Sequence, residues 1–216
     1  MKTLMSVGTR DHMAMRHALE RSWDRFTFRD IVVFTDKPKH FVDLPNVNVQ
    51  YIAPFEDSRL IDVWALTVLP RMMPELCADH IIHVHWDGFV INGAAYHTEW
   101  DQYNFIGAPF CDNGIVGNNG FCKTDQKYWS EIAKLNLPPT IEACWPSDRL
   151  ISQDRWTNNY EGVDYDKLGY RSRLGLNFAP PDVARQFSVD KADRYSGGFG
   201  FHGVERLVDI VRLGLY

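Results

Sequence analysis

The stretch from His83 to Phe89 (HVHWDGF) holds the residues best suited to bind a metal ion. On a strand, the side chains of residues 83, 85 and 87 point to one face. Asp87 falls where that strand should end, just before a glycine, and a carboxylate there can hold a divalent cation. The alternative is an Asx hydrogen bond that caps the turn. We expect His83 and His85 to be packing residues rather than ligands.

Two further stretches offer acid–base or metal-binding groups. Asp148 follows Trp145-Pro146-Ser147 at an expected helix start, where the helix dipole holds a carboxylate ionised. Such a group suits a general base, although stabilising the helix is the commoner role. His202 lies in the glycine- and aromatic-rich segment 197–203 (GGFGFHG), and neutral imidazole is a good metal ligand. The alternative for this lone histidine is a structural role.

Glycines and aromatic residues surround these candidates. The segments 106–109 (IGAP) and 116–121 (VGNNGF) contain glycines that let the backbone approach a ligand closely. Their amides could contact sugar hydroxyls, or they could form a plain surface loop. Four aromatic residues flank the candidate site residues and either line a pocket or belong to the core: Trp86, Phe89, Phe199 and Phe201.

Apolar runs alternate with amphipathic segments along the chain. Strands are expected at 3–8, 31–34, 47–53 and 80–85, and helices at 11–25, 57–73, 124–136, 148–159 and 203–213, with an irregular stretch at 160–198. This alternation predicts a single α/β domain, residues 1–216, with a mostly parallel central sheet flanked by helices. Ligands bind such sheets at the carboxyl ends of the strands.

Composition excludes several classes of protein. With 216 residues, 45% of them hydrophobic, the chain can bury a core, and its net charge of −5 is unlike that of a dedicated nucleic-acid binder. The four cysteines form no C-x-x-C pair, and no apolar run or signal-peptide core suggests a membrane span or export, so we expect a cytoplasmic protein. Dinucleotide-binding, P-loop, nucleophile-elbow and zincin motifs are all missing.

The order of the short strings is more informative than any one of them. The strings W-D-G-F-V, F-I-G-A-P, V-G-N-x-G-F, an acidic helix start and F-G-F-H-G follow one another between residues 80 and 203. This order resembles a family of small GT-A-type glycosyltransferases that is catalogued mainly as a domain of unknown function. The resemblance implies a GT-A-like fold and transfer of a sugar from a nucleoside-diphosphate sugar, with UDP-sugar expected, to an acceptor hydroxyl.

The same resemblance assigns a role to each matching residue. Asp87 and His202 correspond to the ligands of Mn²⁺ or Mg²⁺, and Asp148 to the catalytic acid, which would act as base in an inverting reaction. The positions that would face the acceptor and sugars are Gly107, Asn118, Asn119 and Gly120. The positions that would face the donor nucleotide are Gly8, Thr9, Arg10, Asp36, Trp86 and Asp87.

Three departures from the family strings leave alternatives open. His85, Asn119 and Ser147 stand where the family has Gln, Gly and Glu, so only one carboxylate remains at the helix start. The acceptor could be a glycan, a lipid-linked sugar, a protein or a modified base in DNA, and a retaining reaction is the alternative to inversion. A nucleotidyltransferase and a non-catalytic sugar- or nucleotide-binding module are the rival functions.

Overall fold

A computed structural model describes residues 1–160, 163–190, 193–212 and 214. Its centre is a six-stranded sheet in the order β3-β2-β1-β4-β6-β5, in which β1 pairs in parallel with β2 and β4, and β2 with β3. Only β6 runs antiparallel to its neighbours. The predicted α/β class with a mostly parallel sheet is thereby confirmed. The strands are β1 (Lys2–Val7), β2 (Phe28–Thr35), β3 (Val47–Tyr51), β4 (His80–Val84), β5 (Phe105–Gly107) and β6 (Phe121–Asp125).

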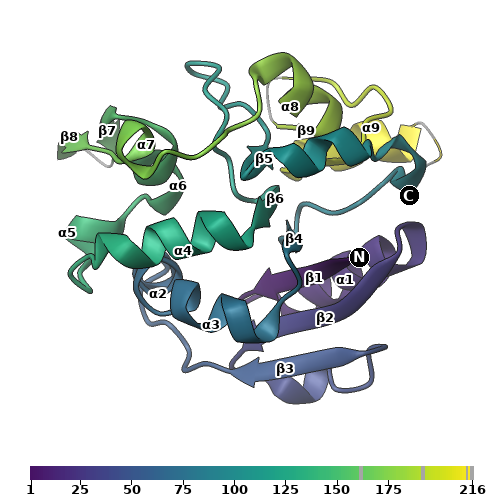
Figure 1. Ribbon diagram of the computed structural model, residues 1–216. Coiled ribbons are helices and arrows are strands. Elements are labelled where there is room, and N and C mark those ends of the chain that lie inside the picture. The colour runs from purple at the N-terminus through teal and green to yellow at the C-terminus, as the bar shows by residue number, and fades with distance from the viewer. Residues whose placement is uncertain (161–162, 191–192, 213, 215–216) are drawn as a thin grey trace.

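Helices pack along this sheet, and short helices and two small strand pairs follow β6 and α4 in the chain (Figure 1). The α-helices are α1 (His12–Arg25), α2 (Leu60–Thr67), α3 (Leu69–Leu76), α4 (Gln126–Leu135), α5 (Ile141–Cys144), α6 (Ser147–Ser152), α7 (Arg171–Leu174), α8 (Pro181–Phe187) and α9 (Glu205–Arg212). Short 3₁₀ turns are η1 (Pro38–His40), η2 (Gly93–Ala95) and η3 (Thr98–Gln102). The remaining strands form two small pairs, β7 (Arg155–Tyr160) with β8 (Val163–Leu168) and β9 (Ser188–Val189) with β10 (Gly200–Phe201). Among the described residues, no helix is both long and apolar enough to cross a membrane.

Two sequence-based expectations about the elements were wrong. The helix expected over 148–159 ends at Ser152, and the chain continues as β7. The sequence of β7, RWTNNY, explains the difference, because aromatic, β-branched and Asn residues are weak helix formers. The described parts of the stretch 160–198 also contain strands and helices rather than irregular chain. The helix expected over 57–73 breaks at Val68, close to Pro70, in agreement with the expectation that this proline kinks or ends it.

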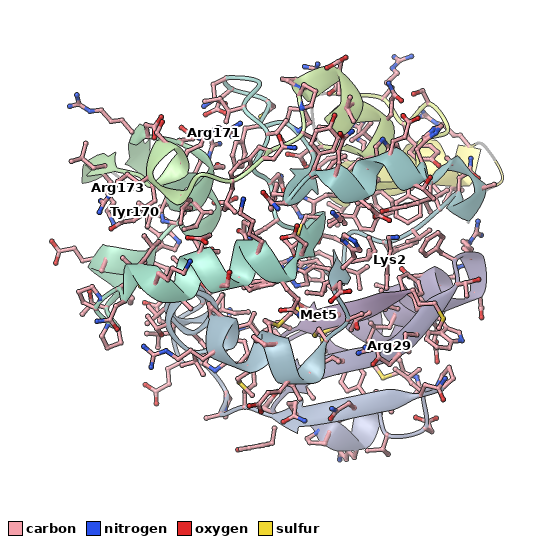
Figure 2. The ribbon with its side chains drawn as sticks, in the orientation of Figure 1. Lys2, Met5, Arg29, Tyr170, Arg171 and Arg173 are labelled. Atoms are coloured by element: carbon pink, nitrogen blue, oxygen red, sulfur yellow. The ribbon has the colours of Figure 1, made fainter. Side chains whose placement is uncertain are left out.

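The middle of the sheet is the most deeply buried part of the fold. Every residue of β1 is buried, including Met5, which Figure 2 labels at the centre of the molecule. The order of the strands reverses at β1, because β2 and β3 lie on one side of it and β4 on the other. A crevice therefore opens at the carboxyl ends of β1 and β4, which is where ligands of open α/β sheets bind.

Candidate functional site

Three metal-binding side chains converge beyond the end of β4. Ring nitrogens of His85 and His202 and a carboxylate oxygen of Asp87 all lie within 4.8 Å of one another. The Nε2 atom of His202 is 3.5 Å from Oδ1 of Asp87, and this oxygen is buried and accepts no hydrogen bond from the described residues. A buried carboxylate oxygen that faces two imidazoles is an arrangement that a divalent cation would satisfy.

A tight turn aims Asp87 at this point. The backbone amides of His85 and Gly88 each donate a hydrogen bond to the other residue's carbonyl, at 3.1 and 3.2 Å. The amide of Gly203 donates to the carbonyl of Asp87 at 2.9 Å, which fastens the end of β10 to the turn. A Cβ at Gly88 would lie 2.9 Å from the carbonyl oxygen of Phe201, so only glycine allows the two segments to approach so closely.

The loop before β6 supports His202 from its other side. The Nδ1 atom of His202 lies 3.5 Å from Oδ1 of Asp190, and Asn118 donates from Nδ2 to Oδ2 of Asp190 at 2.9 Å. Oδ1 of Asn118 accepts from the amide of Gly120 at 3.0 Å. A Cβ at Gly120 would lie 2.0 Å from Nε2 of His202, so the missing side chain makes room for the imidazole. The loop therefore builds the wall against which His202 rests.

The surroundings shift the pKa values of His85 and His202 in opposite directions. Burial, together with the nearby His202, lowers the pKa of His85 to about 4 although Asp87 opposes the shift, so His85 is neutral at pH 7 and its lone pair is available to a cation. Burial also lowers the pKa of His202, but the contact with Asp190 and the charges of Asp87, Asp190 and Asp148 outweigh it and raise the pKa. These carboxylates favour positive charge at this point, either as a proton on His202 or as a bound cation, and the cation would have to displace that proton to bind the imidazole.

A pocket of about 280 Å³ opens beside this cluster at the carboxyl ends of β1 and β4. Four of the predicted donor-binding residues line it: Gly8, Thr9, Arg10 and Trp86. Its other walls come from Val7, Asp11, Met15, Phe55, Ser58, Ile61 and His85. Because His85 belongs to both, the pocket and the cluster are continuous. Asp36 takes no part in the lining; its Oδ1 lies 2.7 Å from Nε2 of His12.

The four aromatic residues that flank the site divide between pocket and core. Trp86 is 43% exposed and lines the pocket. Phe89, Phe199 and Phe201 are 2%, 0% and 0% exposed, and the rings of Phe89 and Phe201 meet edge to face at 4.8 Å between centroids. Trp86 is therefore the one of the four that is available to a ligand.

A smaller and mostly apolar pocket, of about 90 Å³, is also lined by His85. Asn119, a predicted sugar-binding residue, lines it together with Asp62 and Ser147. Gly107 lies behind the same loop, where a Cβ would meet the carbonyl oxygen of Asn118 at 2.2 Å. The predicted sugar-binding residues thus build and line the walls beside the cluster, and their contact with sugars stays a prediction.

Asp148 lies in the first turn of α6, as expected, and close to the cluster. Its Oδ1 accepts a hydrogen bond from the amide of Arg149 at 2.7 Å. Burial raises the pKa of Asp148, and the amide and charge of Arg149 oppose this rise. The charge of Asp148 acts in turn on His202 and on Asp62, so these side chains share one electrostatic environment.

Sequence reasoning missed three members of this arrangement. It predicted that His85 packs, although the alternation of residues 83, 85 and 87 already placed its side chain on the face of Asp87. Asp190 and Asp62 carried no usable signal, because each comes from an element distant in sequence, next to β9 and in α2. Only the folded chain brings them to His202 and Ser147.

The arginines near α6 and α7 make contacts within the chain. Arg149 pairs with Asp112 at 3.0 Å and stacks on Phe110, and Arg171 donates to the carbonyls of Val116 and Ser152. Figure 2 labels Arg171, Arg173 and Tyr170, and the guanidinium of Arg173 lies over the ring of Tyr170. These contacts favour a structural role for Arg149, Arg171 and Arg173 over a role in DNA binding.

Similarity to known proteins is found among solved structures. No family model and no curated protein matches the chain. A solved mannosyltransferase from Pyrobaculum calidifontis, in complex with GDP-Man and Mn²⁺, superimposes with a TM-score of 0.45 and 9% sequence identity. The superposition covers 66% of this chain and 48% of the mannosyltransferase chain, so this chain matches about half the length of that protein.

The division of the aromatic residues makes a first prediction. Phe201→Ala removes a fully buried ring and should cost about 3–5 kcal/mol of stability, measured by denaturant unfolding. Trp86→Ala should leave stability within about 1 kcal/mol of the wild type, because a surface ring is lost. A Trp86→Ala variant as unstable as Phe201→Ala would place Trp86 in the core and contradict its role in the pocket.

Proposed function

We propose that the protein is a metal-assisted glycosyltransferase that moves a sugar from a nucleoside-diphosphate sugar to an acceptor hydroxyl. The observation that carries the proposal is the cluster of His85, Asp87 and His202 beside the pocket at the carboxyl ends of β1 and β4. A nucleotide-sized pocket that adjoins a cation-binding cluster suits a substrate with a diphosphate. The order of the sequence strings between residues 80 and 203 supports the same function.

The side chains of the cluster indicate which metal ion fits. Carboxylate oxygens suit Mg²⁺ and Mn²⁺, whereas imidazole nitrogens suit later transition metals. Two imidazoles and one carboxylate therefore fit Mn²⁺ better than Mg²⁺, and the replacement of the family's Gln by His85 adds to this preference. When bound, the cation would neutralise charge on the departing diphosphate, which is worth several kcal/mol.

The pocket residues would hold the donor. The exposed ring of Trp86 offers a stacking surface for a nucleobase, an interaction worth about 1–3 kcal/mol per base in other systems. Arg10 brings a positive charge to the same pocket, where it can pair with phosphate oxygens. UDP-sugar remains our proposed donor.

Asp148 would act on the acceptor. Its carboxylate takes the proton of the acceptor hydroxyl, the hydroxyl oxygen bonds to the anomeric carbon, and the bond from that carbon to the diphosphate oxygen breaks. The nucleoside diphosphate leaves with the electron pair, and the configuration inverts. The raised pKa of Asp148 makes it a stronger base than an ordinary aspartate.

The metal cluster makes the second prediction. Titration of the protein with UDP and with GDP in a calorimeter should give tighter binding in Mn²⁺ than in excess EDTA. Asp87→Asn should remove most of this difference, because it takes away the charged oxygen of the cluster. Equal affinity with and without the metal would contradict the proposed site.

A matched variant controls for changes in charge. Asp43 is an exposed aspartate that pairs with Arg16, and it does not line the pocket. Asp43→Asn should therefore leave the effect of Mn²⁺ on nucleotide binding intact.

The proposed base makes the third prediction. Asp148→Asn should lower the rate of sugar transfer by about 10²–10⁴-fold, the usual contribution of general-base catalysis, while donor affinity stays within about twofold. Asp182 is an exposed aspartate in the first turn of α8, so Asp182→Asn is a matched control that should retain full activity. Asp154 would be a poor control, because it accepts hydrogen bonds from the amide and hydroxyl of Ser172.

The same measurements separate the rival functions. A non-catalytic binding module would bind nucleotide but would show no transfer that depends on Asp148. Near-full transfer by Asp148→Asn would mean that the enzyme uses another base or retains configuration. Transfer to a glycan, a lipid-linked sugar, a protein or hydroxymethylated DNA in an acceptor screen would identify the acceptor class.

A further inference from the structure

A second carboxyl group, that of Asp62, lies beside the proposed base, and the proposed function leaves it without a role. Asp62 is in the first turn of α2 and lines the smaller pocket together with Ser147 and His85. The hydroxyl of Ser147 donates a hydrogen bond to Oδ1 of Asp62. Ser147 is 3% exposed and directly precedes Asp148, so this contact ties the first turn of α6 to α2.

We propose that Asp62 is a positioning residue for Asp148, which clamps the start of α6 through Ser147 and places a second, titratable charge beside the base. The inference rests on the proposed function only in naming Asp148 the base. The clamp and the electrostatic coupling are properties of the folded chain alone.

The ionisation of Asp62 is coupled to the charge of Asp148. Burial raises the pKa of Asp62 to about 7, the hydrogen bond from Ser147 opposes the rise, and the charge of Asp148 adds to it. Asp62 therefore keeps its proton until the pH approaches neutrality, and the charge of Asp148 contributes to this. Once Asp62 ionises, its charge disfavours a second bare carboxylate nearby, so Asp148 binds a proton more strongly and becomes a better base.

The other titratable groups around Asp62 carry no charge near neutral pH. Burial lowers the pKa of His83 to about 3 and that of His85 to about 4, so both imidazoles are neutral. Burial raises the pKa of Cys144 and of Tyr128, so both stay protonated. Among the described groups that line the pocket or act on Asp62, Asp148 is therefore the charged partner of Asp62 at neutral pH.

Carbon-13 NMR of the aspartate carboxyl groups in the full chain tests this coupling without any substrate. The signal of Asp148 in the wild type should show a second inflection near pH 7, where Asp62 ionises. Asp62→Asn keeps an oxygen that can accept from Ser147 but loses the charge, so this inflection should vanish. Ser147→Ala keeps the charge and loses the clamp, so the inflection should move to higher pH.

Two outcomes would overturn the proposal. One is an Asp148 titration curve that is the same in the wild type and in Asp62→Asn. The other is an Asp148 titration curve in Ser147→Ala whose inflection near pH 7 does not move to higher pH. This second outcome decides the matter if Asp62→Asn does not fold. Asp182→Asn, which removes a first-turn aspartate of α8, should leave the curve unchanged.

Transfer measurements then connect the coupling to catalysis. Ser147→Ala should lower kcat by about tenfold to a hundredfold with an unchanged KM for the donor, because the base loses its alignment. Asp62→Asn should remove a step near pH 7 from the pH–rate profile. If the NMR coupling is present but these kinetic effects are missing, the assignment of Asp148 as base fails while the clamp stands.

Discussion

The close packing of His202 against Gly120 is the contact on which the candidate site depends. The imidazole occupies the space that a side chain at position 120 would fill, between Asp87 and Asp190. Backbone hydrogen bonds hold it there, because the amide of His202 donates to the carbonyl of Val189 and that of Gly203 to the carbonyl of Asp87. A strand end, a loop and a short C-terminal strand are thus fixed around one side chain.

The sheet provides the rigid base for this convergence. β1 and β4 are central strands, and their carboxyl ends deliver the pocket-lining residues 8–10 and the cluster residues 85 and 87 to the same crevice. Binding geometry requires such support, because ligands held by buried strands keep their positions more accurately than ligands on free loops. The smaller pocket and the Asp62–Ser147 contact extend the same network from β4 to α2 and α6.

The sequence was informative where a local pattern encodes the structure. The apolar runs predicted the central strands, and the turn after β4 followed from Asp87 and Gly88. The β7–β8 hairpin was missed because a charged helix start before it suggested a longer helix. Asp190 and Asp62 were missed for a different reason. Their partners lie 12 and 85 residues away in the chain, at His202 and Ser147, and no local pattern reports such a contact.

The central claim is that one divalent cation binds between His85, Asp87 and His202 and faces a diphosphate in the adjoining pocket. Crystals of the protein grown with Mn²⁺ and UDP, with anomalous diffraction recorded at the manganese edge, test it most directly. The account predicts one strong anomalous peak within coordination distance of these three side chains. The diphosphate should lie beside this peak and the uracil ring of UDP near Trp86. A manganese peak elsewhere, or a nucleotide bound away from the ends of β1 and β4, would contradict it.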